Sequence, residues 1–285
     1  MGPQPLQNAD KPSAMPLFPL ALEAGGFAAV FTLAAWAGRV GYLQGQVQAA
    51  PQGTMFAVFL AAFVLATASV IVLIRRNRGQ KFFAFVLAAA VLAGIASLAL
   101  VFFGWPVALG LTIAAYFAWV SFKTVWVFDL LLAIGIAGLA ADVSAQFSPT
   151  AIVILLALLA VYDIGAVYGT KHMVEMGEAM LRHRVFFAMI VPDRPAGLAA
   201  PLADVTRGSG HSFLGTGDLT LPAMLVASAA RAGWLAALSV SLGALLGLVA
   251  VNLIFRSQRV RRPMPALPPI ALGAILGHLA AQLLL

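Results

Sequence analysis

The sequence predicts an all-α polytopic membrane protein. Of its 285 residues, 62% are hydrophobic and only 9% are charged, and the mean hydropathy is +0.98. A soluble domain is about 45–50% apolar and about 25% charged. The excess apolar residues form runs of about 18–22 residues, the length that a helix needs to cross about 30 Å of hydrocarbon. The chain has no cysteine, which excludes disulfide bonds, thiolate catalysis and iron–sulfur ligation.

We expect nine membrane-spanning helices. The apolar runs cover residues 17–38, 55–74, 82–103, 105–122, 125–141, 149–170, 213–231, 232–255 and 264–285. Only Lys123 and Thr124 separate the fourth run from the fifth, so eight spans remain an alternative. Other breaks are clearer because they contain clustered basic residues or proline, as in RSQRVRRP at 256–263.

The basic residues predict the orientation. With nine spans, all but Arg39 and Arg231 of the 17 Lys and Arg residues fall on the side of the N-terminus. Short cytoplasmic loops are enriched in Lys and Arg, so we expect a multi-pass protein of the cell membrane with the N-terminus in the cytoplasm and the C-terminus outside. Loss of one span would scatter these charges, which favours nine spans over eight. Because loops account for the net charge of +7, we expect no nucleic-acid partner.

The chain divides into three parts: a six-helix part at 1–170, a connection at 171–212 and a three-helix part at 213–285. The connection starts with KHMVEMGEAMLRHR, in which oppositely charged residues are spaced four apart and methionines lie on another face. We expect an interfacial helix there, with an extension of the sixth span into water as the alternative. Val185–Val191 follows and is short, apolar and β-prone.

Two aspartates lie well inside the apolar runs. Asp163 and Asp218 occupy the sixth and seventh runs, which are antiparallel, and both lie about 8–10 Å from the cytoplasmic face. A charge near the bilayer centre costs at least ~2.5–3.5 kcal/mol, so each needs a partner or a role. Their matching depth predicts a paired-carboxylate site. A proton or ion pathway, or polar contacts between helices, are the alternatives. Asp129 and Asp142, near the ends of the fifth run, are expected to reach the headgroups.

The surroundings of Asp218 also indicate a site. Gly215 and Gly217 precede it, and glycine lets another backbone approach closely. Pro222 cannot donate a hydrogen bond to the Asp218 carbonyl, which loosens the helix. The prolines of MPALPPI at 264–270 also remove backbone donors, so we expect them to delay the ninth helix and leave carbonyl groups free.

Together these residues resemble the motifs of a known family. Tyr162-Asp163, Gly215-Thr216-Gly217-Asp218 and Pro265-Ala266-Leu267 resemble the YD, GxGD and PAL motifs of presenilin and signal peptide peptidase. Their order and their places on the sixth, seventh and ninth spans agree, so the resemblance covers the whole chain. It is greatest to the archaeal presenilin homologues.

The resemblance implies an intramembrane aspartyl endopeptidase that cleaves transmembrane helices of other proteins in the lipid bilayer. It implies that Asp163 and Asp218 are catalytic. The surrounding substrate-binding residues that it implies are Tyr162, Gly215, Thr216, Gly217, Pro265, Ala266 and Leu267. It implies no metal, cofactor or accessory subunit, and it leaves a homo-oligomer open. Presenilins usually have an apolar residue in place of Thr216 and a much longer sixth-to-seventh connection, so neither substrate preference nor self-cleavage carries over.

Two carboxyl groups can hydrolyse an amide because like charges sharing a site cannot both ionise cheaply, and the pair then shares a proton near neutral pH. The ionised group takes a proton from water, and the protonated group polarises the scissile carbonyl. A helical substrate must first unwind. We predict that Arg207–Phe213 or Val185–Val191 pairs with it as an added strand, with the backbone of Pro265–Pro269 on its other side.

Other functions fit the sequence less well. A transporter could use the acidic pair to relay protons or bind a cation, but the sequence shows no internal repeat and the acids lie toward one side of the membrane. A prepilin peptidase also uses GxGD, yet the PAL segment on a ninth span does not fit it. A serine-type protease is disfavoured because no serine in the core spans is matched in depth by a histidine.

Overall fold

The computed structural model describes residues 17–45, 80–169, 185–206, 209–257 and 264–284, with scattered residues between 57 and 69. Three predictions lie wholly or mostly outside these residues. They concern the second span, the interfacial helix after the sixth span, and Arg207 at the start of one strand candidate.

Eight α-helices in the described part match eight of the predicted runs. They are α1 (Leu17–Leu43), α3 (Gln80–Phe103), α4 (Trp105–Ser121), α5 (Val125–Ala145), α6 (Pro149–Ile164), α8 (Thr216–Ala230), α9 (Trp234–Ser257) and α10 (Leu267–Leu284). Six of the described helices are long and apolar enough to cross a membrane, as expected of a multi-pass membrane protein. The fourth and fifth runs form separate helices because the backbone is extended at Phe122 and Thr124.

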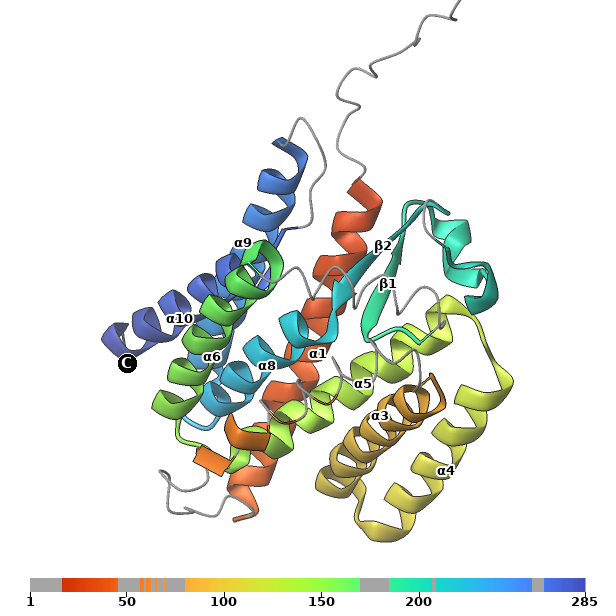
Figure 1. Cartoon of the computed structure of the whole chain (residues 1–285). Coiled ribbons are helices and arrows are strands. Elements are labelled where there is room, and N and C mark those ends of the chain that lie inside the picture. The colour runs from red at the N-terminus through yellow and green to blue at the C-terminus, as the bar shows by residue number, and fades with distance from the viewer. Residues whose placement is uncertain are drawn as a thin grey trace, which may run out of the picture.

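The central helix of the fold is α8. It contacts α1, α5, α6, α9 and α10, and Figure 1 shows it between α6, α9 and α10 on one side and α3, α4 and α5 on the other. Every residue from Pro222 to Ala230 is buried. Because protein rather than lipid surrounds α8, a proline inside it and an aspartate in its first turn are tolerated.

Glycines bring α9 and α10 into backbone contact. A Cβ atom at Gly243 would collide with the carbonyl group of Gly273, and one at Gly247 would collide with that of Pro269. Small residues spaced four apart let helices approach closely in lipid, where the hydrophobic effect does not drive helix association. Gly247 therefore fixes the first turn of α10 against α9.

The connection between α6 and α8 contains a two-stranded antiparallel sheet. Strand β1 (Ala188–Pro192) pairs with β2 (His211–Gly215), so that Ala188 lies opposite Gly215 and Pro192 opposite His211. Residues 188–191 of the β-prone segment predicted from the sequence are thus confirmed as a strand, and Val185–Phe187 lie before it. The two strand candidates pair with each other at Ile190–Phe213 and Val191–Ser212, which sequence reasoning did not foresee.

Two short 3-10 helices, η2 (Pro195–Ala199) and η3 (Leu202–Asp204), join the strands and are tied to the start of α5. The Val125 N–H donates to the Ala200 carbonyl at 3.0 Å, and the Leu202 N–H donates to the Lys123 carbonyl at 2.8 Å. The sheet and its connection are therefore fixed to one end of α5, where Figure 1 also places them.

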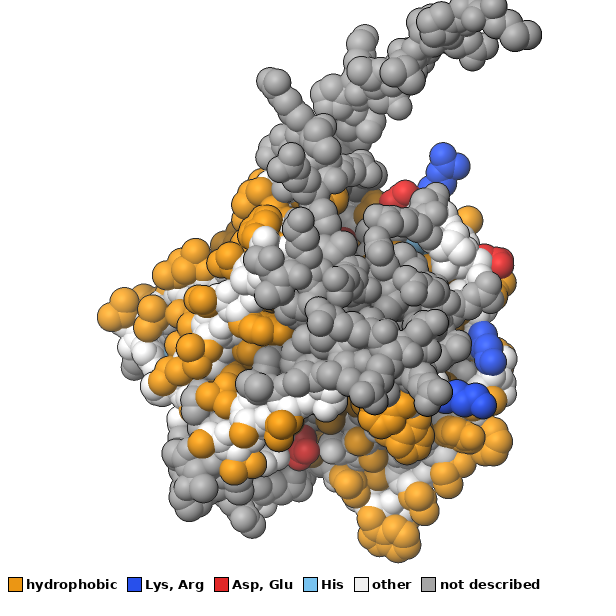
Figure 2. Space-filling view, viewed as in Figure 1, with side chains coloured by type: hydrophobic (Ala, Val, Ile, Leu, Met, Phe, Trp, Pro, Cys, Tyr) orange, Lys and Arg blue, Asp and Glu red, His pale blue; other side chains and the backbone are white. Residues whose placement is uncertain are grey.

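Apolar side chains cover the outside of the helices. In Figure 2 they occupy most of the helix surface that is not grey, whereas the visible Lys and Arg side chains lie on the side of the β-strands and the α4–α5 connection. Trp105, Leu109 and Phe117 of α4 are all more than half exposed. Large apolar side chains exposed in such numbers are suited to lipid rather than to water.

The two basic residues predicted on the outer side of the membrane cap helix ends. Arg39 donates to the carbonyl group of Arg231 at 2.7 Å, and Arg231 donates to those of Ser144 and Phe147 at 3.0 and 3.1 Å. Carbonyl groups at a helix C-terminus have no partner within the helix, and they attract cations. These bonds give both exceptions to the charge rule a structural reason.

Candidate active site

Asp163 lies in the last turn of α6, and its side chain is buried. Two residues after it, the chain changes to a π-helix at Gly165–Gly169. A wider helical turn redirects the side chains beside it and is frequent at functional sites. Sequence reasoning expected one regular helix to residue 170, because hydropathy does not distinguish the two kinds of helix.

Asp218 lies in the first turn of α8, directly after β2. Gly215 ends the strand and caps the helix, and its N–H forms a hydrogen bond with the Asp218 carboxyl group. A Cβ atom at Gly215 would come within 3.0 Å of Asp218 Oδ2. The first glycine of the GxGD sequence therefore leaves room for the carboxyl group, whereas Gly217 is exposed and its missing Cβ faces open space.

The structure brings the two aspartates together. Helices α6 and α8 are in contact, and the carboxyl groups of Asp163 and Asp218 are close enough to interact electrostatically. The two acids that the sequence pairs by predicted depth thus lie near each other in space. Two carboxyl groups in such a place can share one proton, since both cannot ionise cheaply.

The start of α10 lies beside the two aspartates. Its first residue, Leu267, forms a backbone hydrogen bond with the Asp163 carboxyl group. The first N–H groups of a helix have no partner within it and carry partial positive charge, which suits a carboxylate. Because Pro268 and Pro269 have no N–H, Leu267 is the only backbone donor among the first three residues of α10.

This arrangement corrects one expectation and places the remaining PAL residues. The helix begins at Leu267, so Met264–Ala266 stay outside it as expected, but Pro268 and Pro269 do not delay it further, because proline is well accommodated in a first turn. Pro265 and Leu267 are buried and Ala266 is half-buried, just before or at the helix start. Tyr162 is half-buried, next to Asp163 in α6.

Thr216 has a structural role that the sequence did not indicate. Its N–H and its hydroxyl group both donate to the Phe187 carbonyl, at 3.1 and 3.3 Å. Thr216 is the first residue of α8, and these bonds hold the start of that helix to Phe187, the residue before β1. Binding of substrate by Thr216 stays a prediction.

Asp129 is a second residue whose role the sequence missed. It does not simply reach toward headgroups, because its Oδ1 accepts a hydrogen bond from the Ile190 N–H of β1 at 2.9 Å. No local pattern signals a contact between residues so far apart in the chain. Within the described ranges, no three His, Asp or Glu side chains are grouped so as to hold a metal ion.

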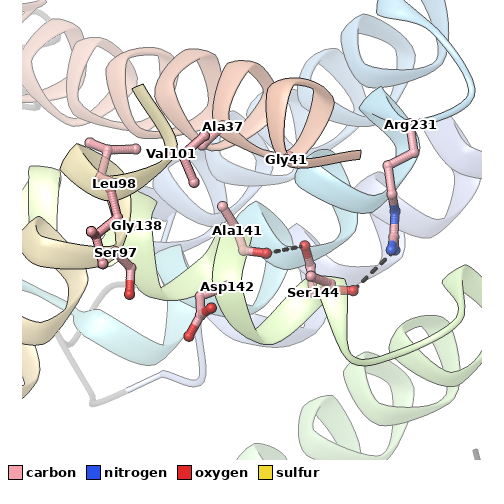
Figure 3. A pocket seen from close by; sticks show the side chains of 13 residues that line it. Ala37, Gly41, Ser97, Leu98, Val101, Gly138, Ala141, Asp142, Ser144 and Arg231 are labelled. Carbon is pink, nitrogen blue, oxygen red and sulfur yellow. Dashed lines mark hydrogen bonds between the residues drawn. The ribbon is translucent and has the colours of Figure 1, made fainter. Parts of the chain in front are cut away.

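A cavity of about 290 Å³ lies at the other end of α8 and is separate from these groups. Figure 3 shows side chains of α1, α3 and α5 around it, with Arg231 directed at the end of α5. Arg231 lies about 20 Å from Asp218 along the helix, at 1.5 Å per residue. None of the motif residues lines this cavity.

Comparisons with known proteins agree with the geometry. The family described as "Signal-peptide peptidase, presenilin aspartyl protease" matches residues 34–285. Two solved structures of a presenilin family intramembrane aspartate protease, in the C222 and P2 space groups, are similar with TM-scores of 0.65 and 0.63. They are 25% and 26% identical to this chain and cover 94% and 95% of it, and 100% and 99% of their own chains are matched. No curated protein matches the chain significantly.

Proposed function

Because the chain belongs to the signal peptide peptidase and presenilin family of aspartyl proteases, we propose that Asp163 and Asp218 are its catalytic pair. Its activity as an aspartic-type intramembrane endopeptidase follows from the family and from the similar solved structures. One observation supports the choice of residues: α6, α8 and the start of α10 converge where the two carboxyl groups interact. The motif residues around them then form the substrate-binding site.

The proposed reaction needs one shared proton and one water molecule. The ionised carboxylate accepts a proton from the water, whose oxygen attacks the scissile carbonyl carbon, while the protonated carboxyl group donates to the carbonyl oxygen. The leaving amine then takes a proton from the pair. The N–H groups of Leu267 and Gly215 hold Asp163 and Asp218 in place. The titration belongs to the pair, so neither aspartate is assigned one role.

We propose nine spans in the cell membrane, with the N-terminus in the cytoplasm and the C-terminus outside. The match of eight described helices to predicted runs supports the number of spans. The basic side chains in Figure 2 lie on the side of the β-strands, and β2 leads directly into the first turn of α8 with Asp218, which supports the orientation. The proposed division into three parts, with boundaries at residues 170 and 212, follows from the same topology.

A purified preparation tests the activity directly. In detergent, the protein is expected to cut a generic single-span substrate, and an inhibitor that mimics the transition state of aspartyl proteases is expected to block it. The transporter alternative makes a different prediction, namely uptake coupled to a pH gradient in proteoliposomes. Absence of cleavage by folded protein on several substrates, together with such uptake, would refute the protease.

We propose that the unwound substrate adds to the free edge of β2. Hydrogen-bonded and non-hydrogen-bonded positions alternate along the sheet, which directs the backbone N–H and C=O of Phe213 away from β1, and its side chain is 37% exposed. An extended peptide can pair with such an edge through its main chain. Since β2 leads directly into α8, a strand on this edge runs toward Asp218.

Phe213→Pro is expected to lower kcat/KM by about 10-fold or more, because it removes a hydrogen bond to substrate and restricts the backbone beside it. Phe213→Ala is the matched control. It loses the ring that stacks on Phe186 with centroids 5.7 Å apart, but it keeps the N–H. Both variants are assayed on one substrate after their thermal unfolding is compared. Equal rates for the two variants would contradict pairing at this edge.

A further inference from the structure

We propose that Asp129 is a positioning residue that determines which peptide bond is cut, because it closes the outer edge of β1 and fixes the sheet relative to Asp218. The inference rests on the proposed function. It adds a residue outside the three motifs to the apparatus that places the substrate.

The direction of the backbone groups follows from the ladder. Two bonds extend it beyond the strands, Thr216 N–H to Phe187 O at 3.1 Å and Asp193 N–H to Gly210 O at 2.8 Å. In an antiparallel pair, hydrogen-bonded and non-hydrogen-bonded positions alternate. The residues of β1 whose backbone groups point away from β2 are therefore Ala188, Ile190 and Pro192.

The outer edge of β1 is closed to a further strand. Asp129 of α5 accepts a hydrogen bond from the Ile190 N–H at 2.9 Å, and Pro192 has no N–H that could donate one. All five residues of β1 are buried. A side-chain acceptor and a proline are two of the ways in which proteins prevent pairing at a sheet edge.

The outer edge of β2 is different. The same alternation directs the backbone groups of His211, Phe213 and Gly215 away from β1. Those of Phe213 make no hydrogen bond within the described residues, and the Gly215 N–H is held by Asp218. Of these two edges, β2 is therefore the one that an added strand can use. One end of that strand would lie beside the aspartates.

Asp129 also fixes where that added strand stops. Helix α5 packs against both β1 and α8, and α8 carries Asp218. The other bonds from the start of α5 reach the connection between the strands, at Ala200 and Leu202, whereas Asp129 holds the ladder itself. A shift by one residue turns every side chain to the opposite face and brings another carbonyl to the pair. The bond at Asp129 thus helps to determine the position of cleavage.

The test compares Asp129→Ala with Asp129→Asn, using a single-span substrate and mass spectrometry of the products. Asp129→Ala is expected to lower kcat/KM by about tenfold, as for loss of one buried hydrogen bond, and to spread cleavage over neighbouring bonds. Asp129→Asn keeps an Oδ1 acceptor and is expected to cut at the wild-type bond. Asp142→Ala, the same kind of change at an exposed site on α5, is expected to leave the cleavage position unchanged.

A second control separates positioning from stability. Ile136→Ala removes a buried side chain two turns along α5 and lowers the thermal stability without changing the acceptor at Asp129. The inference is overturned if Asp129→Ala cuts only at the wild-type bond, or if Ile136→Ala spreads the cleavage equally. Should Asp129→Ala not fold, Asp129→Glu moves the acceptor by one methylene group, and an unchanged cleavage position would overturn the inference. Wild-type protein that cuts no substrate would instead refute the proposed function, and this inference with it.

Discussion

Replacement of either Asp163 or Asp218 by asparagine is expected to reduce peptide-bond cleavage by at least about 10³-fold. Asparagine keeps the size and the hydrogen-bond acceptor of the side chain, so the bonds from Leu267 and Gly215 can persist. It cannot ionise and cannot pass a proton to the substrate. General acid–base catalysis contributes about 10²–10⁴-fold, and a pair that shares one proton loses both functions at once.

The measurement uses purified variants in detergent with a single-span substrate, and a transition-state-mimicking inhibitor of the wild type as a further arm. Asp142→Asn is the matched control, since Asp142 is an exposed acid at the far end of α5. It is expected to cut at the wild-type rate. Thermal unfolding establishes that each variant is folded. Cleavage that survives both substitutions would end the assignment of the catalytic pair.

Gly247→Leu is expected to reduce cleavage by about 10²-fold. A Cβ atom at this position of α9 would collide with the carbonyl group of Pro269 and lie 2.6 Å from Ile270 Cα. Both atoms belong to backbone, so the first turn of α10 must move away from α9. That turn carries the Leu267 N–H that holds Asp163. A displacement of about 1 Å at a catalytic group can cost about 10²-fold in rate.

Gly110→Leu is the matched control for this substitution. Gly110 is a glycine of the apolar helix α4, and a Cβ atom there meets nothing within 4 Å. The same change in size and hydrophobicity is therefore expected to leave the cleavage rate unchanged. Gly247→Leu is also expected to lower the free energy of unfolding by about 1–3 kcal/mol, as for overpacking of a core. A Gly247→Leu variant that cuts at full rate would show that this contact does not position α10.

The motifs predicted the candidate site because each of them is a short run of consecutive residues. Tyr162-Asp163 and the GxGD sequence each occupy a few consecutive residues, so their order and depth can be read without coordinates. The interpretation of MPALPPI was wrong for Pro268 and Pro269, because a proline that removes a donor has opposite consequences inside a helix and in its first turn. Only the place where α10 begins, at Leu267, decides between them.

The strands show a second limit of sequence reasoning. Val185–Val191 is recognisably β-prone, but its pairing with β2 and its bond to Asp129 join residues more than 20 positions apart. A hydropathy profile also assigned Asp129 to the headgroups, since it records depth but not the neighbour that a side chain meets.

The sequence alone determined that this protein crosses a membrane several times and that eight runs in the described part form helices, and it singled out the two acids whose predicted depths agree. Each follows from the free energy of moving residues between water and lipid, which is a sum over consecutive residues. The tertiary structure alone decided that the two carboxyl groups lie close enough to interact, that Leu267 holds one of them, and that Asp129 occupies the outer edge of β1 in the described sheet. These depend on the packing of helices distant in the chain, here set by glycine contacts and single hydrogen bonds that no local pattern encodes.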